Sequence, residues 1–79
     1  MKLNLDQLQK EMNDLRKRRE ELHYTGRADL DCLNKMSAIR KDVTAELSKI
    51  RAQIEVCPLS MLGELRQRER ELLDWKFNN

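Results

Sequence analysis

The residues most able to do chemistry in this sequence are four consecutive cations, residues 16–19, within the segment LRKRREEL. A dense group of lysine and arginine is typical of surfaces that bind nucleic-acid phosphates or acidic proteins. On a helix, however, successive side chains point about 100° apart, so four in a row cannot line one face.

Acidic residues three or four positions away favour ion pairs with the individual cations of this group: Asp14 with Lys17 and Arg18, Glu20 with Arg16, and Glu21 with Lys17. Such pairs would neutralise much of the local charge. We therefore favour the solvated surface of a coiled coil. An acidic partner or nucleic acid is the alternative, with Arg16, Lys17 and Arg18 as the candidate residues.

Side chains for catalysis or metal binding are sparse. The single histidine, His23, lies beside an expected turn, and no motif marks a nucleophile or a paired acid near it. Two glycines cannot build a phosphate-binding loop, and Cys32 and Cys57 lack the paired spacing of a zinc site. We expect no enzyme, no metal and no cofactor, and we expect the cysteines to act as small apolar residues in a reducing, cytoplasmic compartment.

The composition is typical of long helices or coiled coil. Of the 79 residues, 38% are charged and 4% aromatic, and the chain has two glycines and one proline that could interrupt a helix. The 16 basic and 14 acidic residues give a net charge of only +2, which argues against a dedicated nucleic-acid face. No apolar run approaches the roughly 20 residues that a membrane span needs, so we expect no membrane partner.

The first expected helix spans about residues 4–23. Asn4 is its predicted N-cap, with Gln7 three residues later. Thr25 and Gly26 predict the turn that follows, and Gly26 is expected at positive φ as the C-cap. The inward positions repeat with the alternating spacing of a heptad seam: Met1, Leu5, Leu8, Met12, Leu15, Arg19 and Leu22.

The second expected helix spans about residues 29–56, capped by Asp29 or Asp31, and the short connection makes it antiparallel to the first. At 1.5 Å per residue it measures about 42 Å against about 30 Å for the first helix, so part of it needs another cover. Its seam has the same heptad spacing: Leu33, Met36, Arg40, Val43, Leu47, Ile50, Ile54 and Cys57. Three alanines seven residues apart either let a further helix approach closely or serve only as helix formers: Ala38, Ala45 and Ala52.

Arg19 and Arg40 are the charged members of otherwise apolar seams. A charge in such a position destabilises the fold unless it is paired or its head reaches solvent. Pairing the two helices about residue 26 would place Arg19 opposite Asn34 and Arg40 opposite Asn13. The two arginines either fix the register of the helices or face an acidic partner, and both are candidate partner-binding residues.

A third, shorter helix is expected over about residues 59–76, after the break at Pro58, with Ser60 as a competing N-cap. Its middle, RQRERE, contains no apolar residue. The C-terminal segment has two of the three aromatic residues, and tryptophan is enriched among interface hot spots. Leu72, Trp75 and Phe77 are therefore candidate partner-binding residues, with a core role for Trp75 as the equal alternative.

These patterns predict an all-α fold: one domain over residues 1–79, in which an antiparallel coiled-coil hairpin is followed by a shorter third helix. Because the second helix extends beyond the first, we expect a homodimer that completes a helical bundle. The function we favour is a non-enzymatic protein–protein interaction module, such as an adaptor, regulator or inhibitor. The alternative is a regulator that binds or mimics nucleic acid through the basic cluster of the first helix.

Overall fold

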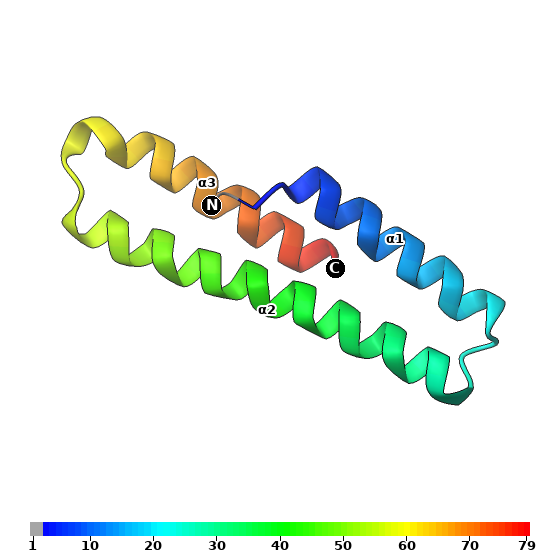
Figure 1. Cartoon of the computed structure of the whole chain (residues 1–79). Helices are drawn as coiled ribbons and strands as arrows, with labels where there is room; N and C mark the ends of the chain where they lie inside the picture. The colour runs from blue at the N-terminus through cyan, green and yellow to red at the C-terminus, as the bar shows by residue number, and fades with distance from the viewer. Residues whose placement is uncertain (1–2) are drawn as a thin grey trace. The chain divides into compact units, whose positions relative to one another are not determined.

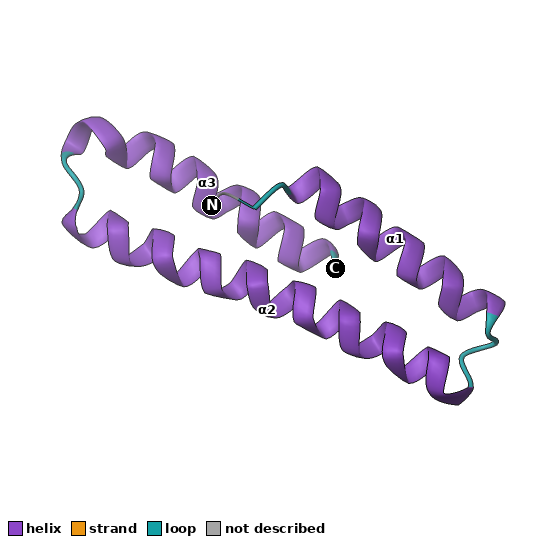
Figure 2. Ribbon diagram, in the orientation of Figure 1, coloured by secondary structure: helices purple, strands orange, loops and turns teal. Residues whose placement is uncertain are grey.

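The computed structural model describes residues 3–79, and within them the chain forms three helices and no strand (Figures 1 and 2). Helix α1 spans Leu5–Glu21, α2 spans Gly26–Val56 and α3 spans Leu59–Asn78. The all-α prediction is confirmed, while Met1 of the predicted first seam lies outside the described residues. None of the helices in this part of the chain is both long enough and apolar enough to cross a membrane.

Helix α1 begins at its predicted cap. Asn4 has an extended backbone (φ −92°, ψ 102°), and its Oδ1 accepts a hydrogen bond of 3.1 Å from the backbone N–H of Gln7. This bond satisfies one of the amide donors that the first turn of a helix leaves without a helical acceptor. The sequence therefore predicted both the position and the chemistry of this helix start.

The end of α1 differs from the prediction. The N–H of His23 donates to the carbonyl of Glu20 and the N–H of Tyr24 donates to that of Arg19, each at 3.0 Å. These are the two bonds of a Schellman motif, which needs a left-handed residue just after the helix. His23 takes that place at φ 56°, followed by Tyr24 at φ 58°. Gly26 does have a positive φ of 86°, but as the first residue of α2 and not as the C-cap of α1.

Helix α2 also begins earlier than predicted. It starts at Gly26, so the prediction that Asp29 or Asp31 is its N-cap is wrong. Asp29 lies inside the first turn, where a negative charge is favoured by the helix dipole. Its side chain is buried, because it is used in an ion pair with α1 and not in a cap.

Helix α3 follows the proline break. Pro58 is the N-cap residue, with an extended backbone (φ −69°, ψ 155°), whereas Ser60 lies within the helix and is not the cap. The polar middle of α3 stays helical and forms two ion pairs, Arg68–Glu71 at 3.3 Å and Arg51–Glu69 at 3.2 Å, the second of which joins it to α2.

The chain divides into two compact units that share α2. Unit 1 extends through Lys41 and contains α1 with the first part of α2, and unit 2 is Asp42–Asn79. In each unit a short turn reverses the chain, so its two helical segments run antiparallel (Figure 1). The buried apolar residues are Met12, Cys32 and Met36 in unit 1, and Val43, Leu47, Ile50, Leu72 and Trp75 in unit 2.

The predicted seams account for most of this burial. Every described position of the first seam is buried or half-buried, and the second seam agrees except at one position, Arg40, which is exposed. A long arginine at a seam position can reach solvent by extending past its apolar neighbours.

Adjacent leucines of α3 test this assignment of the buried face. Leu72 is fully buried whereas Leu73 is 40% exposed. We expect Leu72→Ala to lower the free energy of unfolding by about 2–5 kcal/mol, because it leaves a cavity. Leu73→Ala removes the same atoms from a side chain that is already 40% exposed and should lower it by about 1 kcal/mol or less. Urea unfolding followed by circular dichroism measures both, and equal losses would contradict the assignment.

Candidate functional site

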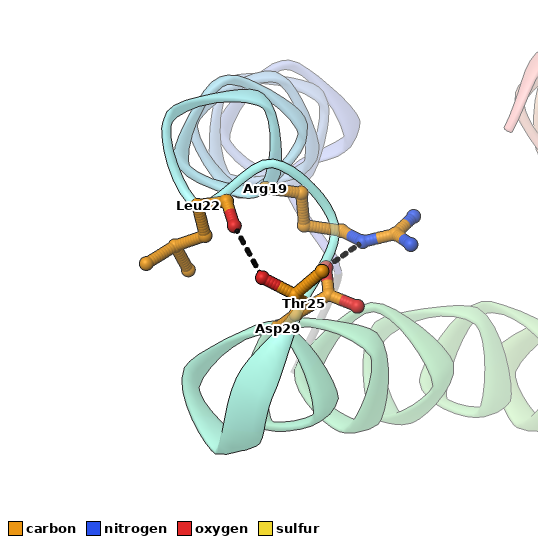
Figure 3. Close-up of polar contacts among 4 residues, drawn as sticks. All are labelled: Arg19, Leu22, Thr25 and Asp29. Carbon is orange, nitrogen blue, oxygen red and sulfur yellow. Dashed lines mark hydrogen bonds and ion pairs between the residues drawn. The ribbon is translucent and has the colours of Figure 1, made fainter.

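Arg19 of α1 forms an ion pair with Asp29 of α2, and this pair lies at the turn of unit 1 (Figure 3). The Nε of Arg19 donates to Oδ1 of Asp29 at 2.7 Å, a short, charge-assisted hydrogen bond. The Asp29 side chain is only 8% exposed and that of Arg19 is 23% exposed. The expected position of Arg19 opposite Asn34 is therefore wrong, because α2 starts right after the turn and brings an earlier residue beside α1.

Two further contacts hold the same turn. The guanidinium carbon of Arg19 lies 5.1 Å from the ring centroid of Tyr24, a cation–π arrangement. The Thr25 hydroxyl donates to the carbonyl of Leu22 at 3.1 Å (Figure 3). The hydrogen bond to Asp29 raises the pKa of the Arg19 guanidinium above its ordinary value, while burial opposes this rise. Arg19 therefore acts within its own chain, as a charged connection between two helices.

Sequence reasoning missed Asp29 as the partner of Arg19. A signal was present: Asp29 is an acid in the first turn of the helix that follows, ten residues after a seam arginine. Identifying Asp29 as the partner requires the correct start of α2. Because the helix was expected to begin at residue 29, Asp29 was considered as a helix cap and not as an ion-pair partner.

A double-mutant cycle tests the pair. Arg19→Met should destabilise the chain because it leaves the buried Asp29 carboxylate without its counter-charge, and adding Asp29→Asn should recover part of the loss. The control is Arg18→Met, which removes a neighbouring exposed cation and should leave stability nearly unchanged. The measurement is the unfolding midpoint in urea, and strictly additive effects of the two substitutions would contradict the coupling.

The basic cluster is less neutralised than its sequence suggests. Arg16 is half-buried and its Nη1 donates to Oδ1 of Asn13 at 3.4 Å. Lys17 and Arg18 are exposed, and the structure of residues 3–79 contains no ion pair for either, so their expected pairs with Asp14 and Glu21 are wrong. Exposed pairs at this spacing stabilise by only a few tenths of a kcal/mol, which is comparable to the entropy lost in holding two long side chains together.

The C-terminal candidates separate into core and surface. Leu72 and Trp75 are buried, and the indole Nε1 of Trp75 is a buried donor with no acceptor among the described residues. Phe77 is 91% exposed, so it is the one of the three that a partner can reach without opening the core. Arg40, the remaining candidate, is exposed on α2, and Asn13, its expected opposite, accepts hydrogen bonds from Gln9 and Arg16 of its own helix.

An exposed apolar group at the turn between α2 and α3 did not emerge from the sequence reasoning. Val56 is 84% exposed, Leu59 88% and Met61 49%. We call these three residues the α2–α3 tip. They flank Pro58, which follows α2 and precedes α3, so they lie where the chain reverses, with their side chains exposed. The run VCPLSML, apolar on both sides of a proline, was the signal.

Other sites and relationships give no further assignment. Among residues 3–79, no three His, Cys, Asp or Glu side chains gather where they could hold a metal ion, and the two cysteines are free thiols. Comparison with protein-family models, curated proteins and solved structures finds no match to the chain.

Proposed function

We propose that this chain is a cytoplasmic, non-enzymatic interaction module that associates with a second copy of itself and regulates or adapts a further protein. The observation that supports docking on a further protein is the α2–α3 tip, three large apolar side chains exposed within a stretch of six residues. Exposed apolar groups of this kind mark interaction sites more often than scattered single residues do.

The free energy gained by burying the α2–α3 tip suits an anchor within a larger interface. Fully burying an exposed Val, Leu or Met side chain contributes about 1.5–3 kcal/mol, and because Met61 is already half-buried, the three together supply roughly 3–7 kcal/mol. Association costs about 4–15 kcal/mol in lost freedom, so the tip alone gives weak binding at best. Contacts around it must supply the rest, as in interfaces where a few apolar side chains dominate the energy.

The test places a photo-crosslinking amino acid at Leu59 and, as a control, at Leu30, an exposed leucine near the other turn. We expect a defined protein to crosslink in cells through Leu59 but not through Leu30. Val56→Ser combined with Leu59→Ser should weaken binding of the purified partner at least about tenfold, since two anchors are lost. Identical crosslinks from both positions, or unchanged affinity of the double variant, would exclude the tip.

The alternative, nucleic-acid binding, is supported by Lys17 and Arg18, which are exposed and form no ion pair within residues 3–79. If these residues contact phosphates, affinity for a random RNA or DNA duplex should fall steeply with added salt, and Lys17→Ala with Arg18→Ala should reduce the slope of that dependence by about two. Fluorescence anisotropy measures it, with Lys41→Ala and Lys49→Ala as the matched control. Absence of binding at low ionic strength would exclude this alternative.

A further inference from the structure

A groove lies between the two helices of unit 1. Each helix supplies three residues at positions i, i+3 and i+4, and they line a shallow, open hollow of about 400 Å³: Glu11, Asp14 and Leu15 from α1, and Lys35, Ala38 and Ile39 from α2. Leu15 and Ile39 are half-buried and form an apolar floor, while the charged residues are exposed at the rim. The carboxylates lie on the α1 side and the ammonium on the α2 side.

The charged residues of this rim form no ion pair among the described residues. Within the described part of the chain, neither Glu11 nor Asp14 makes an ion pair, and Lys35 makes none either. An apolar floor beside two unpaired carboxylates favours an occupant that combines apolar side chains with cations. A helix with such a stripe is the usual occupant of a groove between two helices.

Helix α3 carries a stripe with this chemistry. Its members repeat with heptad spacing and are all exposed: Gly63, Arg66, Arg70, Leu73 and Phe77. We call them the α3 stripe. Arg66 and Arg70 form no ion pair among the described residues. Gly63 has open space where a side chain would stand, and a hollow of about 480 Å³ on this face can receive a ridge from another helix.

We propose that the α3 stripe of one copy docks in the unit 1 groove of a second copy. Arg66 and Arg70 face the carboxylates of Glu11 and Asp14 and Leu73 covers the apolar floor, while Phe77, about 6 Å further along α3, extends the apolar contact beyond it. Asp74, which also lines the hollow beside the stripe and makes no ion pair in the described chain, suits Lys35 on the opposite rim. The inference rests on the self-association proposed above and names the surfaces that make it.

Charge also selects this pairing over simpler ones. In a parallel pairing of two α3 stripes each guanidinium would meet its own copy, and in an antiparallel pairing centred on Arg70 that residue would do so, and like charges in contact oppose association. Groove against stripe joins opposite signs. If each of two copies docks its α3 stripe in the groove of the other, they form a closed twofold dimer. If each copy instead docks its stripe in the groove of a third copy, an open chain of copies results, and both assemblies contain the same contact.

Charge reversal tests the contact. Sedimentation velocity at low ionic strength should show the wild-type chain as a dimer or a larger assembly. Arg66→Glu with Arg70→Glu, or Glu11→Arg with Asp14→Arg, should each raise the dissociation constant at least about tenfold, because attraction becomes repulsion. Lys41→Glu with Lys49→Glu reverses two exposed cations outside the groove and the stripe and should leave the assembly intact. Circular dichroism checks that each variant keeps its helicity.

Mixing the two reversed variants gives the decisive result. Each then offers the other a complementary groove and a complementary stripe, so an equimolar mixture should assemble although neither variant does alone. A monomeric wild type at all concentrations, an assembly indifferent to both reversals, or a mixture that stays monomeric would overturn the proposal. The tip is untouched by these substitutions, so crosslinking through Leu59 would still support the docking of another protein.

Discussion

The buried carboxylate of Asp29 is the constraint on which the first hairpin depends. A buried charge destabilises a protein by several kcal/mol unless a counter-charge and hydrogen bonds compensate for it. Arg19 supplies both, and to reach Asp29 it requires α1 to end and α2 to begin within a few residues. The left-handed His23 and Tyr24 make this short reversal at a conformational cost of roughly 1–2 kcal/mol each, which the ion pair and the Schellman bonds offset.

The narrowness of the helical seams explains why so much binding potential lies on the outside. Each helix buries one row of side chains, and apolar residues outside those rows have no place in the core. They remain exposed at the α2–α3 tip and along the α3 stripe, whereas Leu15 and Ile39 in the groove of unit 1 are half-buried. A chain this short buries little apolar surface, so its fold is only marginally stable. The apolar side chains that stay outside the core add little to that stability and remain available for association.

Periodic features of the fold were predictable from the sequence, and features set by one side chain were not. The seams and the Asn4 cap depend on local spacing, which the sequence displays directly. The start of α2 and the partner of Arg19 depend on a histidine adopting a conformation usually left to glycine, and no local rule selects His23 over Gly26 for it. The burial of Trp75 and the exposure of Phe77 likewise depend on how α3 packs, which two aromatics two residues apart do not reveal.

The turn of unit 1 is chemically unlike an ordinary surface loop. All four of its backbone amides donate to carbonyls, Leu22 to Arg18, His23 to Glu20, Tyr24 to Arg19 and Thr25 to Leu22. Solvent reaches the side chains, yet proton exchange and proteolysis both require these bonds to open first. The turn should therefore exchange its amide protons as slowly as the helices it joins, and the hairpin should open as one unit instead of loosening from its bend.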